Sequence, residues 1–467
     1  MPVAGSDPAV PASTSATPQR GKAEITQPTS DRSRVDTTVA GSPKGFRALL
    51  HIMGPGLVTG ASDDDPSGVA TYSQAGALFG LGLLWVSLVT LPLMAGVQEI
   101  CDRTALATGR GLGELAAEKY RGKARPILVV LIAALIVANT LNIAADLVAI
   151  GSGMNLLHAG PTWIWALIAG ALITALVTLG NFVQVARVFK LICLSLLTYI
   201  AVLFVVHVDW RQVAIHTLVP HIEFSSTFIA LLVAVLGTTI SPYLFFWQSA
   251  HRLEEMRDEP EGGDQPMALA DRSNRGAARK ERNSRFDVFF GMTFSNVVMF
   301  AIIVATASTL QGKTITSAAD AAAALQPVAG QWAEELFALG FIGTGMLAVP
   351  VLAGSGAVGM AGLLGQRWGF SRSVRKAPVF YGLVALGTVG GTVLSLTTSN
   401  PIQLLVVVAV INGIAAAPFL LLVMLISRDR RIMGDYRNGR LATFVGWAAF
   451  VLMATAALTL LAQTLHH

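Results

Sequence analysis

The chain alternates between long apolar segments and short polar ones, and this pattern is its most regular feature. A helix needs about 20 apolar residues to cross the hydrocarbon core of a bilayer. Eleven segments of this kind follow one another. They cover residues 52–79, 81–103, 126–151, 161–180, 188–207, 226–250, 286–310, 334–360, 377–397, 401–426 and 441–463. The pattern predicts an all-α membrane protein with eleven transmembrane helices.

The chain before the first apolar segment has a different character. Residues 1–45 are rich in Ser, Thr, Pro and Ala and contain no apolar run, so they cannot bury enough surface to fold. They also lack the apolar region of a secretory signal, which spans roughly 7–15 residues. We expect a disordered cytoplasmic tail at 1–45 and one transmembrane domain at 46–467.

Composition agrees with the membrane class. Hydrophobic residues make up 53% of the chain and charged residues 13%, well below the roughly 25% charged residues of soluble domains. The net charge of +5 does not indicate a nucleic-acid partner, because basic residues also gather in the cytoplasmic loops of membrane proteins. Cys101 and Cys193 lie far apart in apolar segments, which favours neither a disulfide framework nor a zinc site.

The basic residues also predict how the chain is oriented in the bilayer. If the amino terminus lies inside, every Lys and Arg except Arg211 and Lys313 falls on the inner side of the eleven spans. Cytoplasmic loops carry the excess of Lys and Arg. We therefore expect a protein of the cell (inner) membrane with a cytoplasmic amino terminus and an external carboxyl terminus.

The first apolar segment is interrupted by charge and by a helix breaker. Aspartates occupy positions 63–65, and Pro66 and Gly68 follow them. A charge at the bilayer centre costs about 2.5–3.5 kcal/mol on insertion scales, so such carboxylates mark a functional site. Pro66 removes a backbone donor and Gly68 relaxes the chain, so we expect an unwound segment at 65–68. Free backbone groups in hydrocarbon persist only where protein or a water-filled cavity covers them.

A second break, Ser241-Pro242, interrupts the sixth segment, five spans after the first. An odd offset between corresponding helices predicts an inverted repeat, in which two discontinuous helices meet near the midplane and form the substrate site. The repeats would cover 50–210 and 224–427, and 441–463 would be an extra helix. A simple proline kink is the alternative for Pro242 alone, but two matched breaks favour a site.

Several short motifs carry a family resemblance. They are Gly54-Pro55-Gly56, Asp65-Pro66, Ala70-Thr71, Gln74-Ala75-Gly76, Leu84-Trp85-Val86, Asp287, Asn296 and Met433-Gly434-Asp435-Tyr436. From about 50 to 463 the chain resembles the natural resistance-associated macrophage protein (Nramp) family of divalent metal transporters. The resemblance implies alternating access by rocking of helices 1, 2, 6 and 7, with an ion as substrate, no enzyme activity and no cofactor.

The chain departs from the family pattern at both breaks. The family's Asp-Pro-Gly-Asn reads Asp65-Pro66-Ser67-Gly68 here, and its Met-Pro-His reads Ser241-Pro242-Tyr243. The ligand set that remains is Asp65, the backbone carbonyls near Ala61 and Thr238, and the hydroxyls of Ser67, Thr239 and Ser241. Thioether sulfur favours soft transition metals, whereas carboxylate, carbonyl and water suit Mg²⁺ and Mn²⁺. The departures resemble Nramp-related magnesium transporters.

Proton coupling is in question for the same reason. Asp146 resembles a family carboxylate linked to proton release, but Ala149 replaces a neighbouring glutamate and Tyr243 replaces a histidine. Proton switching near neutral pH is mainly a property of histidine. Asn139 and Asn142 share a helix face with Asp146, which predicts either a path for water or protons or hydrogen bonds between helices.

An organic substrate is the alternative interpretation. The amino-terminal ends of the half-helices at Gly68 and Tyr243 would offer N–H groups to a substrate carboxylate. The pocket for an aromatic or aliphatic acid would be lined by Tyr72, Tyr243, Phe246 and Trp247. Against this, an ionised Asp65 repels an anion and no basic residue lies near the breaks. The sequence therefore favours a cation and leaves the organic substrate open.

Other polar residues have two interpretations each. Asp64 is either a second metal ligand beside Asp65 or a cap of the broken helix. Asn412 lies either near the ion or beside a packing glycine, and the charged residues of 251–285 predict a solvated loop. Glu99, Asp102 and Arg103 predict an ion pair at the membrane interface. The sequence lacks the phosphate-binding Gly-Lys-Ser/Thr and the His-Glu-x-x-His motifs, so it predicts a secondary transporter or facilitator.

Overall fold

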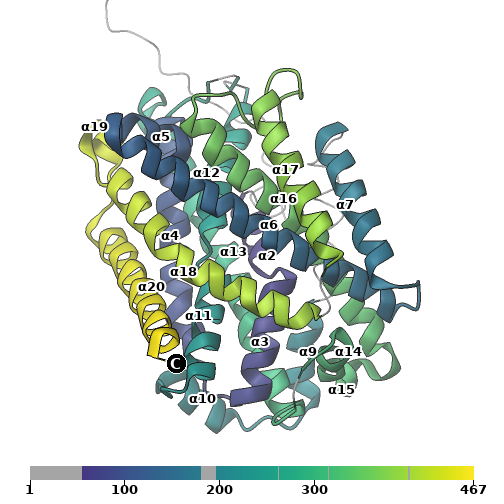
Figure 1. Cartoon of the computed structure of the whole chain (residues 1–467). Helices are drawn as coiled ribbons and strands as arrows, with labels where there is room; N and C mark the ends of the chain where they lie inside the picture. The colour runs from purple at the N-terminus through teal and green to yellow at the C-terminus, as the bar shows by residue number, and fades with distance from the viewer. Residues whose placement is uncertain are drawn as a thin grey trace, which may run out of the picture. The chain divides into compact units, whose positions relative to one another are not determined.

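The computed structural model describes residues 55–179, 196–260, 262–263, 265–313, 315–397 and 400–466. These residues belong to one compact unit, 36–467, and they form helices, turns and loops without a strand (Figure 1). The predicted disordered tail at 1–45 lies outside the described residues.

The helices follow the apolar segments in chain order. The first half contains α2 (Pro55–Asp63), α3 (Pro66–Phe79), α4 (Trp85–Thr108), α5 (Leu112–Lys119), the 3-10 helix η1 (Gly122–Ala124), α6 (Arg125–Leu156), α7 (Thr162–Leu179), α9 (Leu197–Val205) and α10 (Trp210–Leu218). The second half contains α11 (Ser226–Thr239), α12 (Pro242–Arg257), η3 (Leu269–Asp271), α13 (Asn274–Thr309), α14 (Ala318–Ala322), η4 (Ala323–Leu325), α15 (Gln326–Ala329), η5 (Gly330–Trp332), α16 (Ala333–Leu363), α17 (Pro378–Ser395), α18 (Pro401–Ser427), α19 (Arg430–Met433), η6 (Gly434–Tyr436) and α20 (Arg440–His466).

The chain is an all-α membrane protein, as predicted, and its helices agree with eleven spans. Within the described ranges, eight helical segments are long and apolar enough to cross a bilayer. They are α6, α7, α11 with α12, α13, α14 to α16, α17, α18 and α20. Of the other three predicted spans, the first is divided into α2 and α3, and the second is α4, which carries three charged residues. The fifth lies partly at 188–195, outside the described residues.

The broken helices pack among the longest helices of the molecule. α2 and α3 both lie against α13, α11 lies against α18, and α12 lies against α4 and α16. A Cβ atom on Gly237 in α11 would lie 2.2 Å from the carbonyl oxygen of Ala409 in α18, so the two backbones touch. Small residues allow such close helix crossings in membranes, where hydrophobic burial does not drive association.

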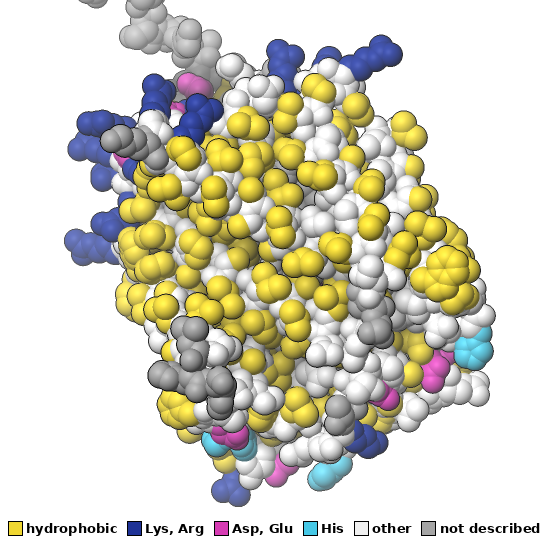
Figure 2. All heavy atoms as spheres, viewed as in Figure 1, with side chains coloured by type: hydrophobic (Ala, Val, Ile, Leu, Met, Phe, Trp, Pro, Cys, Tyr) yellow, Lys and Arg dark blue, Asp and Glu magenta, His cyan; other side chains and the backbone are white. Residues whose placement is uncertain are grey.

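The surface separates apolar and basic regions. On the face shown in Figure 2, hydrophobic side chains cover the middle, and Lys and Arg gather along the edge that carries α5 and α19 in Figure 1. Exposed large hydrophobic residues are abundant on α7, α9, α17 and α20. A soluble monomer rarely exposes so large a contiguous apolar surface, whereas lipid tails cover it in a membrane.

Candidate functional site

The first break is shorter than the sequence predicts. α2 ends at Asp63 and α3 begins at Pro66, so the break consists of Asp64 and Asp65. The expectation of an unwound segment at 65–68 is therefore wrong, because the residues after Asp65 are helical. Proline is favoured at the first position of a helix, where its fixed φ suits the helix and its missing N–H is not needed.

Asp65 caps α3 and collects hydrogen bonds from three helices. Its side chain is only 2% exposed. Oδ1 accepts hydrogen bonds from the Ser67 hydroxyl (2.6 Å) and the Gly68 N–H (2.8 Å). Oδ2 accepts longer ones from the Tyr243 hydroxyl (3.3 Å) and the Asn142 amide (3.5 Å). Because these donors belong to α3, α12 and α6, the carboxylate lies where the two broken helices meet α6.

The second break also places proline at the start of the following helix, but its N-cap side chain makes no hydrogen bond to that helix. α11 ends at Thr239, Ser241 occupies the N-cap position and Pro242 begins α12. The Ser241 hydroxyl donates to the carbonyl oxygens of Gly237 and Thr238, the latter at 3.0 Å. Ser241 therefore satisfies carbonyl groups that the end of α11 leaves without helical partners.

The two threonines before this break differ in their contacts. The Thr239 hydroxyl donates only within α11, to the carbonyl oxygens of Val235 (3.1 Å) and Leu236 (3.2 Å). The Thr238 hydroxyl lies 3.1 Å from the Tyr72 hydroxyl of α3 and so connects the two broken helices. Ala61 is buried in the last turn of α2.

Asp63 and Asp64 contact a different helix from Asp65. Both accept hydrogen bonds from the Ser295 hydroxyl of α13, at 2.5 Å to Asp63 and 3.1 Å to Asp64. Asp65 instead occupies the N-cap position of α3, where its side chain accepts the Gly68 N–H. Asp64 therefore does not cap α3, and its role as a second metal ligand stays a prediction.

The polar residues of α6 divide between two partners. The Asn139 amide donates to the carbonyl oxygen of Leu352 (2.8 Å) and to the Ser355 hydroxyl (3.0 Å), both in α16. Asn139 therefore makes a hydrogen bond between helices, one of the two predicted roles. Asn142, one turn from Asp146, reaches Asp65 instead. Asp146 is fully buried, and its carboxylate makes no hydrogen bond to another described residue.

Asn412 and Trp247 are two further predicted site residues, in α18 and α12. Asn412 in α18 is buried, and its side-chain amide makes no hydrogen bond to another described residue. It is next to Gly413, whose Cβ would lie 2.5 Å from the carbonyl oxygen of Val233. Trp247 is one turn beyond Tyr243 in α12, and its ring contacts His251 and Phe370, with centroid distances of 5.4 and 6.1 Å.

Four buried carboxylates lie in and around the first break and α6. Within the described residues, none of them forms an ion pair or hydrogen bond with Lys, Arg or His; they are Asp63, Asp64, Asp65 and Asp146. Nor does the described part of the chain contain three or more His, Cys, Asp or Glu side chains grouped to hold a metal ion. A cation at Asp65 would therefore also need neutral oxygen ligands or water.

Comparison with known proteins identifies the family. The sequence model described as natural resistance-associated macrophage protein-like (Nramp) matches residues 56–463, which is most of the chain. The chain belongs to the Nramp family.

Relatives and structural neighbours match this Nramp chain over most of its length. The divalent metal cation transporter MntH of Verminephrobacter eiseniae is 27% identical over 422 residues, covering 86% of this chain and 87% of that protein. The protein of the same name from Aeromonas hydrophila is 28% identical and covers 87% and 96%. A manganese transporter of Eremococcus coleocola has a TM-score of 0.67 at 17% identity, covering 91% of this chain and 90% of its own. The structural likeness shows that the fold is shared.

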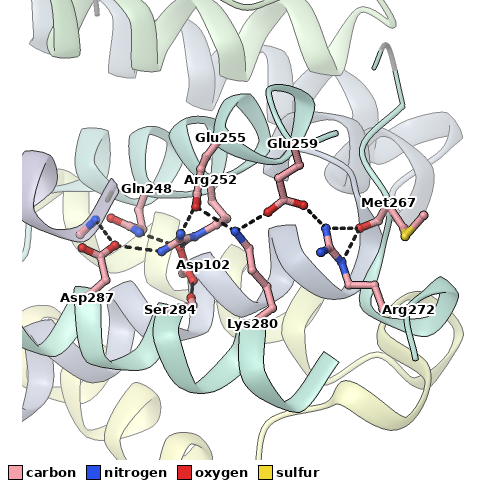
Figure 3. Close-up of polar contacts among 11 residues, drawn as sticks. Asp102, Gln248, Arg252, Glu255, Glu259, Met267, Arg272, Lys280, Ser284 and Asp287 are labelled. Atoms are coloured by element: carbon pink, nitrogen blue, oxygen red, sulfur yellow. Dashed lines mark hydrogen bonds and ion pairs between the residues drawn. The ribbon is translucent and has the colours of Figure 1, made fainter. Parts of the chain in front are cut away.

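The Nramp chain also contains a buried charge network that sequence reasoning missed (Figure 3). Arg252 of α12 is 3% exposed and donates to Asp102 of α4 (2.6 Å) and Asp287 of α13 (3.0 Å). Asp287 also accepts the N–H of Gly56 in the first turn of α2 (2.8 Å). Gln248 adds a hydrogen bond to Asp102 (2.7 Å). The network therefore joins α2, α4, α12 and α13.

The prediction of a solvated loop at 251–285 is wrong for Arg252. α12 continues to Arg257 and carries Arg252 into the protein. The Glu99–Arg103 pair is confirmed at 3.1 Å, but Asp102 binds Arg252 instead. The sequence did contain one signal for this network: Asp102 and Asp287 lie in apolar spans, where a buried carboxylate needs a nearby cation.

Proposed function

We propose that this chain is a secondary transporter or facilitator that moves a divalent cation, Mg²⁺ or Mn²⁺, by alternating access. The cation would bind at the two helix breaks, with Asp65 as its charged ligand. The metal is the substrate and no cofactor is required.

One observation carries the proposal: the contrast between two sets of buried carboxylates. Asp102 and Asp287 share an ion pair with Arg252, whereas Asp65 and Asp146 have no basic partner among the described residues. Buried charges in proteins are normally paired or bind a cation. An uncompensated pair of carboxylates in a membrane attracts cations and repels organic anions.

The relatives support a divalent metal as the cargo. Proteins that share 25–28% of their residues with this chain over most of its length carry the name divalent metal cation transporter. The choice between cations rests on the ligand types. Ser241 supplies oxygen at the position where the family resemblance places the methionine sulfur, and Gly68 stands where it places the asparagine amide. The side-chain ligands that remain are oxygens, which suit Mg²⁺ and Mn²⁺.

Further ligands would come from groups close to Asp65. The candidates are the carbonyl oxygens of Ala61 and Thr238, and the hydroxyls of Ser67 and Thr239. The amide oxygens of Asn142 and Asn412 accept no hydrogen bond from another described residue, which leaves them available to a cation or to water. A hydrated Mg²⁺ needs only one or two carboxylates and keeps several waters.

Alternating access is supported by the charge network. The network joins α2, α4, α12 and α13, which belong to helices 1, 2, 6 and 7 of the predicted topology. These four would move together against the remainder, with the predicted inverted repeats at 50–210 and 224–427. The positive-inside rule supports a cytoplasmic amino terminus and an external carboxyl terminus.

Proton coupling is not part of the proposal. Asp146 stays a candidate for an ion or proton path together with Asn142, but Ala149 and Tyr243 stand where the family resemblance places titratable groups. The organic-acid alternative loses support because one of the two backbone N–H groups that it assigns to the substrate carboxylate already donates to a side chain of the protein. The Gly68 N–H donates to Asp65 at 2.8 Å, so the carboxylate of the chain itself occupies that anion position.

A thermal-shift panel on the purified protein tests the proposal. A ligand that binds the folded state stabilises it, by about 2.7 kcal/mol at 100 times its Kd. We expect Mg²⁺ or Mn²⁺ to raise the unfolding temperature, and the increase to disappear in Asp65→Asn. Stabilisation by organic acids or amines but by no divalent cation would instead establish the alternative substrate class.

A further inference from the structure

A polar cavity lies away from the helix breaks. It has a volume of about 650 Å³ and is bounded by α5, the end of α12 and the segment after α16. This is the basic edge of the molecule, where α5 appears in Figure 1 and Lys and Arg gather in Figure 2. Five arginines from separate parts of the chain line it: Arg110, Arg121, Arg257, Arg367 and Arg372.

Trp368 organises one wall of this cavity. Its ring is 2% exposed, and the guanidinium carbon of Arg257 lies 4.4 Å from the ring centroid. The indole N–H of Trp368 donates to Glu114 at 2.7 Å. Arg257 also forms an ion pair with Glu254 (3.9 Å) and donates to the carbonyl oxygen of Trp368 (3.4 Å). Stacking on the indole holds its guanidinium in a fixed plane as part of this wall.

The charges that line the cavity leave a positive surplus. Three carboxylates face the five arginines, and Glu118 forms an ion pair with Arg110. Arg121 and Arg367 are exposed, and neither forms an ion pair with another described residue. Two guanidinium groups therefore remain available to a ligand that enters from solution or from the membrane surface.

We propose that this cavity binds the phosphate group of an anionic ligand. Guanidinium groups bind phosphate oxygens in a bidentate manner, and basic pockets at the cytoplasmic side of membrane proteins bind anionic lipid head groups. The volume lies within the range of small-molecule sites. The phosphate can come from a lipid head group or from a soluble molecule. This site does not depend on the proposed cation transport.

The first arm of the test uses inorganic phosphate and the full-length protein in detergent. Arg121→Gln/Arg367→Gln removes the two available charges, and Arg430→Gln/Arg437→Gln removes two exposed charges that do not line the cavity. We expect phosphate to raise the unfolding temperature of the wild type and the control. The phosphate concentration for half of the effect should rise at least about tenfold in the cavity variant, since charge-assisted hydrogen bonds are lost.

The second arm distinguishes the sources of the phosphate. Native mass spectrometry would count phosphatidylglycerol retained from nanodiscs, with phosphatidylcholine as the comparison. Retention that the cavity variant loses and the control keeps identifies a lipid head group, and a phosphate response without such retention identifies a soluble ligand. The proposal is overturned if both variants respond alike, or if sodium chloride at equal ionic strength reproduces the phosphate effect.

Discussion

The phenol oxygen of Tyr243 lies 3.3 Å from Oδ2 of Asp65 and 3.1 Å from the carbonyl oxygen of Ser62. A phenol has one hydrogen to donate, so these two acceptors of the first break compete for it. A cation at Asp65 would compete with the same hydrogen for the same lone pairs. Tyr243 connects the second broken helix to the first, and under the proposed function it would stabilise the cation-free state.

Tyr243→Phe should separate these two effects. Without cation, the variant should be less stable by about 0.5–1.5 kcal/mol, because a buried hydrogen bond is lost. With Mg²⁺ or Mn²⁺, its unfolding temperature should rise more than that of the wild type, because Asp65 and Ser62 are freed. Tyr381→Phe is the matched control, since it loses a hydrogen bond to Arg372 away from the breaks. A cation response smaller than that of the wild type would argue against competition at Asp65.

Arg252→Gln should be one of the most damaging single substitutions in the chain. It leaves Asp102 and Asp287 buried without a cation, and breaking a buried ion pair costs about 3–5 kcal/mol. Arg285→Gln removes a guanidinium that is 55% exposed and should cost no more than about 1 kcal/mol. Thermal unfolding of both variants in detergent checks the difference.

A second substitution distinguishes charge from packing at Arg252. Arg252→Gln/Asp287→Asn should recover part of the lost stability, because one of the two stranded carboxylates is neutralised. If the double variant were less stable than Arg252→Gln by the full cost of Asp287→Asn alone, the two residues would not be coupled and the network account would be wrong.

Gly237→Ala tests the contact between α11 and α18. The added methyl group would lie 2.2 Å from the carbonyl oxygen of Ala409, so the helices must separate. Overpacking of this kind costs about 1–3 kcal/mol. Gly439→Ala adds the same group where nothing lies within 4 Å and should leave the unfolding temperature nearly unchanged. Equal effects of the two substitutions would show that the close crossing is absent.

Asp429 provides a pH-dependent contribution outside the membrane-spanning helices. Hydrogen bonds from the Lys119 side chain and the Arg431 N–H hold the pKa of Asp429 below its ordinary value of 3.8. A carboxyl group with a lowered pKa stabilises the folded state above the ordinary value, and the contribution is lost as pH falls through the lower folded pKa. The stability difference between wild type and Asp429→Asn should therefore be constant from pH 7 to about 5 and decrease below about 4. A difference that instead changed between pH 7 and 5 would assign it to another group.

Local chemistry made the breaks predictable from sequence. Each combines a residue type common at the N-cap position with proline, at Asp65-Pro66 and at Ser241-Pro242, and the structure has a helix end at both. The error in the extent of the first break arose because Pro66 begins a helix as readily as it ends one. The interhelical hydrogen bonds of Asn139 were one of two predicted outcomes.

The network around Arg252 was not predictable in the same way. Asp102 is 150 positions from Arg252 in sequence and Asp287 is 35, and the partner of Asp102 depends on how α4, α12 and α13 pack. Periodicity identifies an apolar span but not which neighbour a charge at its end will contact. For the same reason, the hydrogen bonds from Ser295 to Asp63 and Asp64 required the structure.

The most direct test of the account is uptake of Mn²⁺ and Mg²⁺ into proteoliposomes by the wild type, Asp65→Asn and Asp209→Asn. Both aspartates cap helices, and asparagine caps equally well, so the two variants differ mainly in where a charge is lost. We predict that Asp209→Asn transports like the wild type and that Asp65→Asn loses at least about 100-fold in uptake, as expected when a buried ion loses its charged ligand. Unchanged cation uptake in Asp65→Asn would contradict the central claim.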